Sequence, residues 1–336
     1  MGLFNKEVVA KNYTPLDIAR ARHLKLVVRD MESDTAKVQK RDKIIRAIWL
    51  TLVYAFLVFM SVVIVIPFYW MIITSLKSVN EIRNQVTYFP ETVVWQNYVI
   101  LFKGAQVGEF FDNTQIISPF EFWVYLRNTL IVGTLSTLGT IVTTILAAFA
   151  FARLQFKGRD FLFTLLLATM MIPGEMMVIT NYLTVANLGW LDTDVGVFTS
   201  MIIPFVVSVF YIYLLRQNFK QIPNELYYAA KVDGTGDFKY LLKVMVPIAM
   251  PTLITISILK MMGSWNSYVW PMMVTTKDDM RLITTGLRKA FTSEEGRTVQ
   301  GLQMAGSTIV TAPLLVVFVV LRKYIMRGVS RSGIKG

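Results

Sequence analysis

Six long apolar runs, separated by polar segments, dominate the pattern of hydrophobic and polar positions along the chain. About 20 predominantly apolar residues are enough to span the hydrocarbon core of a bilayer. Backbone polar groups in that core have no water to bond, so such runs fold as helices. The pattern predicts an all-α integral membrane protein with six transmembrane helices. The expected spans are residues 47–76, 128–152, 161–183, 195–215, 248–273 and 301–321.

Two of these runs contain a charged residue. Pro173-Gly174-Glu175 interrupts the third run, and Lys260 lies inside the fifth. Charged groups within a membrane usually face a cavity or the interior of a bundle. Glu175 and Lys260 are therefore candidates either for a polar path or for a structural role, as an ion pair with each other or with a partner. Pro173-Gly174 predicts a bend, which either lines such a path or is tolerated by packing.

The distribution of Lys and Arg predicts the orientation of the spans. With the N-terminus inside, segments 1–46, 153–160, 216–247 and 322–336 are cytoplasmic and hold 24 of the 34 basic residues. The outer segments hold 9, and the outer loop 184–194 has none. Basic residues accumulate on the cytoplasmic side of membrane proteins. We therefore expect both termini to be cytoplasmic.

Residues 1–46 and 77–127 are the two long segments that precede and follow the first span. Thr14-Pro15 is a plausible helix start in the polar N-terminal extension. This extension is either a docking or membrane-surface helix or a solvated segment that packs loosely on the inner loops. The first span begins too late and is too long for a signal peptide, so we interpret it as an uncleaved anchor. The outer loop 77–127 is rich in aromatic residues and is expected to fold as a small cap.

Composition narrows the function classes. Hydrophobic residues make up 54% of the 336 positions and charged residues only 17%. The chain has no cysteine, and its one histidine is His23, so thiolate catalysis and Cys or multi-His metal sites are excluded. The net charge of +12 falls mainly in the expected inner segments, which fits a membrane surface and not nucleic acid. No phosphate-binding Gly-x-x-x-x-Gly-Lys-Ser/Thr loop occurs, so the chain is not expected to be an ATPase or another enzyme.

The inner segment 216–247 is too long for a plain connection and too patterned for disorder. Pro223-Asn224 predicts a helix start, with Glu225 in the first turn, where the helix dipole favours an acid. Asp233-Gly234 predicts a turn before a second short helix. The expected face of the first helix is Leu226, Ala229, Ala230 and Asp233. The expected apolar face of the second helix is Phe238, Leu241, Leu242 and Met245.

Ala229-Ala230-x-x-Asp233-Gly234, followed after nine residues by Val244-x-Val246-Pro247, resembles the EAA motif of ABC-importer permeases. In that family the motif forms a coupling helix that sits in a cleft of a cytoplasmic ATPase subunit. The resemblance implies coupling roles for Glu225, Tyr228, Ala229, Ala230, Asp233, Gly234 and Pro247. Tyr228 stands where the motif has its Glu, and Glu225 lies one turn earlier. The alternative is an amphipathic inner helix without a partner.

Further stretches resemble the carbohydrate-importing branch of this family, over about residues 47–336. They are Trp265-Asn266-Ser267-Tyr268-Val269-Trp270-Pro271, Met171-Ile172-Pro173, Leu188-Gly189-Trp190-Leu191-Asp192-Thr193 and the ending Gly328 to Gly336. The likeness is strongest to the maltose-permease-like second subunit of oligosaccharide importers. It implies the type I importer permease fold, in a bacterial or archaeal cytoplasmic membrane.

The resemblance also implies partners. These are a homologous second permease, a dimer of cytoplasmic ATPase subunits that bind ATP and Mg, an extracytoplasmic solute-binding protein and membrane lipid. No cofactor is expected on this chain itself.

Polar and aromatic groups within the spans are candidates for a sugar path, because sugar hydroxyls bond amides and hydroxyls and sugar rings stack on aromatic faces. Each of them has an ordinary alternative role in helix packing or at the membrane interface. The candidates are Glu175, Asn181, Tyr182, Lys260, Trp265, Asn266, Tyr268 and Trp270.

Two other functions remain open at this point. A stand-alone secondary transporter would need a coupling-ion site and usually inverted repeats, and the sequence shows no repeat. A non-transport membrane protein that docks through the inner loop is the other alternative.

Overall fold

The computed structural model describes residues 15–103, 105–106, 116–117, 120–290 and 300–330. The chain divides into two compact units, residues 1–69 and 70–336. Thr14 and the ending after residue 330 lie outside the described residues, so the expectations for them stay predictions.

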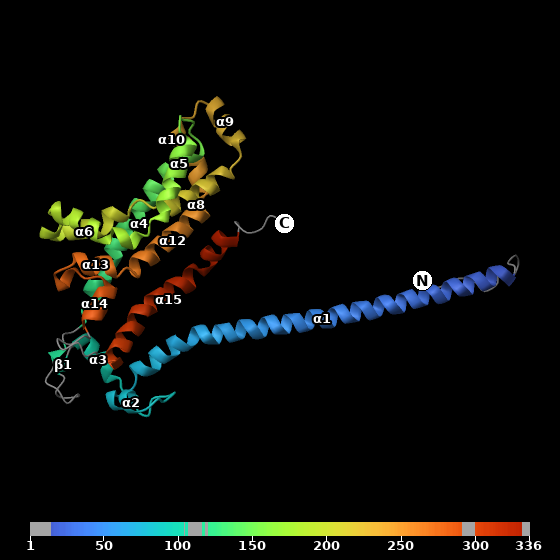
Figure 1. The fold of residues 1–336 in the computed structure, drawn as a ribbon, viewed down its shortest axis with the longest axis horizontal. Coiled ribbons are helices and arrows are strands. Elements are labelled where there is room, and N and C mark those ends of the chain that lie inside the picture. Colours follow the sequence, from blue (N-terminus) through green and yellow to red (C-terminus); the bar gives the residue numbers. More distant parts are fainter. Residues whose placement is uncertain (1–14, 104, 107–115, 118–119, 291–299, 331–336) are drawn as a thin grey trace. The chain divides into compact units, whose positions relative to one another are not determined.

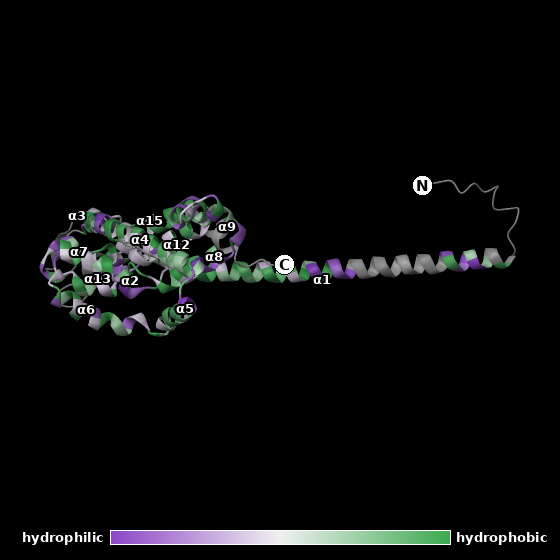
Figure 2. Ribbon diagram, turned by 90° about the horizontal axis from the view of Figure 1, so that it is seen from above, coloured by the Kyte–Doolittle hydropathy of each residue, from purple (hydrophilic) through white to green (hydrophobic). Residues whose placement is uncertain are grey.

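The first unit consists of most of one helix, α1 Pro15–Ser75. The helix begins at the Pro15 that was expected in its first turn. It runs without a break from the polar extension into the first apolar run, with Pro67 inside it. Figure 2 shows the change from polar to hydrophobic colours along α1. The apolar part, Arg41–Ser75, is long enough to cross a bilayer.

Three long helices of the second unit lie side by side (Figure 1). α4 Phe122–Ala152 packs on α12 Met250–Trp265, which also packs on α15 Gln300–Ser330, and α4 also packs on α8 Val209–Lys220. The other helical elements are α2 Val79–Asn84, α3 Gln96–Lys103, α5 Arg159–Ala168, η3 Thr169–Met171, η4 Gly174–Met177, α6 Val178–Asn187, η5 Trp190–Asp192, α7 Asp194–Ile202, η6 Ile203–Phe205, α9 Asn224–Val232, α10 Asp237–Tyr240, η7 Leu241–Met245, α11 Val246–Ile248, α13 Val269–Val274, η8 Asp278–Met280 and α14 Ile283–Ala290.

The expectation of an all-α membrane fold is confirmed, apart from one pair of two-residue strands. β1 Ala105–Gln106 pairs antiparallel with β2 Ile116–Ile117 inside the outer loop. In the same loop, the Asn97 amide on α3 donates to the carbonyls of Ser75 at 2.8 Å and Lys77 at 3.1 Å. These bonds attach α3 to the end of α1 within the second unit.

Among the described residues, three helices are long and apolar enough to cross a membrane, or up to six if each of three bent pairs is one span. The three single helices are Arg41–Ser75, Phe122–Ala152 and Gln300–Val320. The bent pairs are Arg159–Met171 with Gly174–Asn187 at 85°, Asp194–Phe205 with Val209–Lys220 at 46°, and Asp237–Ile248 with Met250–Trp265 at 78°.

Only the first of these bends was expected, at Pro173-Gly174. The hydrophobic pattern predicted spans over 195–215 and 248–273 but did not reveal the bends in these two regions. The first breaks between η6 and α8, next to Pro204, which has no N–H to continue the helix. The second bends at Ala249, between Pro247 and Pro251, and α12 ends at Trp265, before α13.

Side chains from other helices satisfy the carbonyl groups that the break in the fourth run releases. The Phe205 carbonyl accepts hydrogen bonds from Lys260 Nζ at 2.8 Å and Thr140 Oγ1 at 3.3 Å. The Val206 carbonyl accepts one from Thr143 Oγ1 at 2.6 Å. Broken helices are tolerated at membrane depth only when their freed groups find such partners.

Candidate functional site

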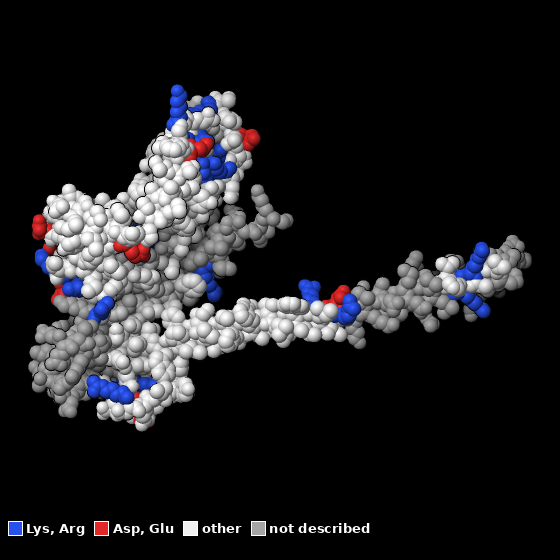
Figure 3. All heavy atoms as spheres, viewed as in Figure 1, with Lys and Arg blue, Asp and Glu red and all other residues white. Residues whose placement is uncertain are grey.

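Two short helices of segment 216–247, α9 and α10, lie at one end of the second unit (Figure 1). α9 begins at Asn224, directly after Pro223, which agrees with the helix start expected from the sequence. Figure 3 shows Lys, Arg, Asp and Glu side chains gathered at this end.

Gly234 ends α9 with a left-handed turn. Its φ of +71° is a conformation that side chains with a Cβ rarely adopt. The Gly234 N–H donates to the Lys231 carbonyl at 3.0 Å, and the Thr235 N–H donates to the Ala230 carbonyl at 2.8 Å. This pair of bonds is the Schellman motif, which satisfies carbonyls at a helix end. The Asp-Gly dipeptide of the sequence motif is thus the structural stop of α9.

The outer surface of α9 carries large apolar side chains that stay exposed in the second unit. Val232 is 88% exposed, Tyr228 is 60% exposed and Leu226 is 44% exposed. Glu225 and Ala229 are also exposed, whereas Ala230 is partly buried against the core that contains Phe219 and Tyr240. Bulky apolar groups on a nine-residue helix at a charged end of the molecule are typical of a docking surface.

The expected apolar face of the second helix was half wrong. Leu241 and Met245 are buried, but Phe238 is 64% exposed and Leu242 is 49% exposed. α10 ends at Tyr240, and Leu241–Met245 continues as a π-helix, whose wider turn changes the angular spacing of side chains. The four residues therefore do not share one face.

Asp237 connects the two short helices. Its carboxylate accepts a hydrogen bond from Tyr227 Oη at 2.8 Å and pairs with Lys231 Nζ at 2.7 Å. The hydrogen bond to Asp237 raises the pKa of the Lys231 ammonium. Burial, and then the bond to Asp237, raises the pKa of the Tyr227 hydroxyl. The Tyr227 ring also meets the Tyr240 ring edge-on, with centroids 5.2 Å apart.

Arg153, the residue after α4, holds the start of α9. Its Nη2 donates to the Phe219 carbonyl at 2.9 Å and to the Ile222 carbonyl, and its Nη1 donates to Asn224 Oδ1. The side chain is buried, so these bonds replace the water that a guanidinium would otherwise bind. A groove of about 820 Å³ beside α9 is lined by Arg153, Tyr227, Tyr228 and Asp237, among others. Pro247 lies beyond α10 and η7, exposed in α11.

A second hollow lies between α4, α8 and α12. Its volume is about 420 Å³. Four serines and one tyrosine contribute hydroxyl groups, three aromatic rings contribute flat apolar walls, and one lysine contributes a charge. These lining residues are Ser136, Ser208, Ser264, Ser267, Tyr211, Phe205, Phe210, Trp270 and Lys260.

The family model described as "Binding-protein-dependent transport system inner membrane component" matches residues 139–331, more than half of the chain. The chain belongs to this family. Its members are components of transport systems and not enzymes, and they are integral proteins of the inner membrane. The match also decides against a stand-alone transporter and against a non-transport membrane protein.

Curated relatives agree with this membership. The arabinooligosaccharides transport system permease protein AraQ of Halalkalibacterium halodurans is 27% identical over 85% of this chain and 96% of its own length. The diacetylchitobiose uptake system permease protein NgcG of Streptomyces coelicolor is 27% identical over 83% of this chain and 87% of its own.

A solved structure shares the fold. The crystal structure of a bacterial ABC transporter involved in the import of the acidic polysaccharide alginate matches with a TM-score of 0.68 and 21% identity. The match covers 82% of this chain and 96% of the solved one. It supports the importer permease fold that the EAA-like motif implies.

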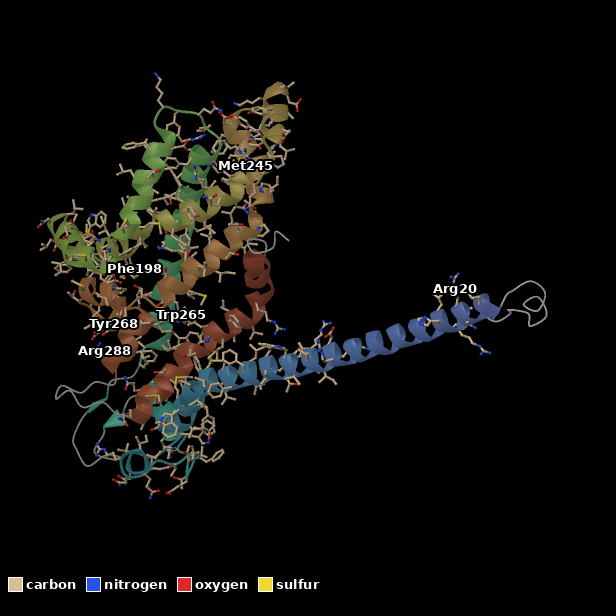
Figure 4. All side chains as sticks on the ribbon, turned by 45° about the vertical axis from the view of Figure 1, so that its right-hand side comes forward. Arg20, Phe198, Met245, Trp265, Tyr268 and Arg288 are labelled. Carbon is tan, nitrogen blue, oxygen red and sulfur yellow. The ribbon has the colours of Figure 1, made fainter. Side chains whose placement is uncertain are left out.

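The structure separates the sugar-path candidates of this importer component. Only Lys260 and Trp270 line the 420 Å³ cavity. Trp265 is buried in the cluster around Phe122 and Leu302, and Asn266 is exposed at the end of α12. The Arg288 guanidinium lies over the Tyr268 ring, with its Cζ 5.4 Å from the ring centroid (Figure 4).

The other three candidates lie on η4 and α6. Glu175 and Asn181 are outside the cavity lining, and Tyr182 packs against the cluster that contains Val197 and Trp270. Among the described residues, Glu175 makes no ion pair with Lys260, whose ammonium donates to the Phe205 carbonyl. The ion pair between Glu175 and Lys260 that the sequence allowed is thus not formed within this chain.

Sequence reasoning missed most of the cavity. Ser136 lines it, and Thr140 and Thr143 bond the carbonyls of the nearby helix break. The three recur at helical spacing on α4, and this polar stripe within an apolar run was an available signal. Phe205 and Ser208 gave no comparable signal, since they reach the cavity only through the unexpected break between η6 and α8.

Proposed function

We propose that this chain is one of two permease subunits of an ATP-driven importer for a carbohydrate, most simply an oligosaccharide. Relatives of similar length named for arabinooligosaccharides, diacetylchitobiose and lactose support the substrate class. A relative named for sn-glycerol-3-phosphate extends the class to a phosphorylated polyol. The proposed location is a bacterial or archaeal cytoplasmic membrane, with both termini cytoplasmic.

The proposed partners are a homologous permease, a dimer of cytoplasmic ATPase subunits, an extracytoplasmic solute-binding protein and surrounding lipid. ATP and Mg would bind in the ATPase subunits, and this chain would bind no cofactor of its own. The exposed surface of α9 is the observation that carries the proposal. Val232, Tyr228 and Leu226 present apolar area that the second unit leaves exposed.

Rigid connections allow α9 to pass on a displacement. Arg153 fixes the start of α9 to the end of α4, and Asp237 fixes its body to α10. α10 continues through η7 and α11 into α12. Closure of the ATPase dimer around α9 would therefore move α4 and α12, two of the helices that line the 420 Å³ cavity. The proposed coupling residues are Glu225, Tyr228, Ala229, Ala230, Asp233, Gly234 and Pro247.

The test is the activity of the assembled importer. Ala229→Trp adds bulk to the exposed face of α9 without entering the core. We expect solute-stimulated ATP hydrolysis to fall by about tenfold or more, which corresponds to about 1.4 kcal/mol of docking free energy. Thr184→Trp, on the exposed face of α6, is the matched control and should leave the activity unchanged. Normal coupling in the Ala229 variant, or failure of any ATPase to co-purify with the wild-type chain, contradicts the proposal.

A further inference from the structure

The cavity between α4, α8 and α12 has an unusual charge balance. Of the described residues that line it, Lys260 alone carries a formal charge, and no Asp or Glu is among them. The remaining lining combines serine and tyrosine hydroxyls with the rings of Trp270, Phe205 and Phe210. Hydroxyls and flat rings suit a sugar, but they leave the lysine without a counter-charge.

The contacts of Lys260 do not neutralise it. Its Nζ donates one hydrogen bond, to the carbonyl of Phe205 at 2.8 Å, and that acceptor is neutral. Among the described residues, no carboxylate lies within ion-pair distance of Nζ. An ammonium has three donors, so two remain for whatever enters the cavity.

The position of Lys260 makes this charge informative. It lies inside α12, in a run otherwise apolar from Ile248 to Met262 apart from a few hydroxyl groups. Cations within membrane spans are rare, and those that occur usually face a cavity or the interior of a bundle. The Phe205 carbonyl also accepts from the neutral Thr140 hydroxyl at 3.3 Å, so the helix break alone does not require a charged donor.

We propose that the solute carries an anionic group, a carboxylate or a phosphate, and that Lys260 is the residue that selects it. This inference rests on the proposed function, because it assumes that the cavity belongs to the solute path. The sugar ring would lie against Trp270, with its hydroxyls toward Ser136, Ser208 and Ser264, and the anionic group would meet Nζ of Lys260. The class is acidic or phosphorylated saccharides.

Saturation-transfer NMR on the assembled importer in nanodiscs of neutral lipid tests the inference. The probes are digalacturonate, galactose 6-phosphate and the neutral control digalactose. We expect at least one anionic probe to bind about tenfold more tightly than digalactose, the effect of one ion pair partly shielded from water. The preference should weaken as NaCl is added, because salt screens the pair. The two anionic probes distinguish a carboxylate from a phosphate.

Three variants locate the effect. Lys260→Met should abolish the preference for the anionic probe, whereas Lys260→Arg should keep it because the charge remains. Lys103→Met, at the exposed end of α3, is the matched control and should also keep the preference. The inference is overturned if digalactose binds as well as both anionic probes. It is also overturned if Lys260→Met leaves the preference intact, or if it weakens neutral and anionic probes equally.

The same preparation separates this inference from the proposed function. Co-purification of an ATPase and its stimulation by solute test the function. If both are present and the anionic preference is absent, only the role of Lys260 is wrong.

Discussion

The indole N–H of Trp270 donates to the carbonyl of Ser200 at 3.0 Å. Ser200 lies four residues before Pro204, so its carbonyl is the one that a helical N–H at position 204 would have bonded. α13 thus repairs the hydrogen bond that Pro204 removes from α7. The sequence predicted that Trp270 lines a sugar path. Its side chain lies in the cavity wall and also makes this hydrogen bond to Ser200.

Trp270→Phe should therefore destabilise the protein, because it leaves the buried Ser200 carbonyl without its donor. The expected cost is about 1–3 kcal/mol, the penalty for an unsatisfied buried polar group. Trp265→Phe is a matched control. The Trp265 indole N–H finds no acceptor among the described residues, so its removal should cost less. Thermal unfolding of the purified importer measures both, and equal losses of stability would contradict the role given to Trp270.

Gly234→Ala should weaken the end of α9, since a Cβ disfavours a φ of +71° by about 1 kcal/mol. The strain is conformational, because no atom lies within 4 Å of the added Cβ. Gly236→Ala has equal space and a φ of −69°, so it should have no such effect. Hydrogen exchange of the α9 amides in the assembled importer distinguishes them. Faster exchange in both variants, or in neither, would refute a special requirement at Gly234. Gly234→Asn should restore part of the protection.

Arg153→Met should make the segment between α8 and α9 more mobile. It removes the donors to the Phe219 and Ile222 carbonyls, at an expected cost of about 2–3 kcal/mol for a buried charge-assisted network. Arg159→Met is the control, because Arg159 bonds the exposed Asp160 at 3.2 Å on the surface. Limited proteolysis after residue 219 should accelerate in the first variant only. An unchanged cleavage rate would show that Arg153 does not anchor α9.

Local sequence signals predicted the ends of α9 in segment 216–247 well. Features that depend on packing between distant segments could not be predicted from the sequence. Pro223 and Gly234 start and stop α9 through their own backbone preferences, so no tertiary information was needed. Likewise, apolar length alone places the second run, which ends at Ala152 as expected.

The cavity shows the opposite case. Ser136, Ser208 and Ser264 come from three helices, and only packing brings them together. Hydropathy shows how apolar a segment is but not whether its helix changes direction. The break after Phe205 was therefore missed, even though Pro204 lies in the fourth apolar run. The π-helix at Leu241–Met245 likewise changed side-chain directions that a regular helical period had predicted.

The exposed surface of α9 is the proposed docking site for a cytoplasmic ATPase subunit. Because the chain has no cysteine, a single Val232→Cys substitution offers one attachment point for a photo-crosslinker, on a side chain that is 88% exposed. Thr184→Cys on α6 is the control. Irradiation of membranes that contain the assembled importer should join Val232→Cys, and not the control, to a chain with a phosphate-binding ATPase loop. No ATPase adduct from Val232→Cys, or equal adducts from both positions, would contradict the account.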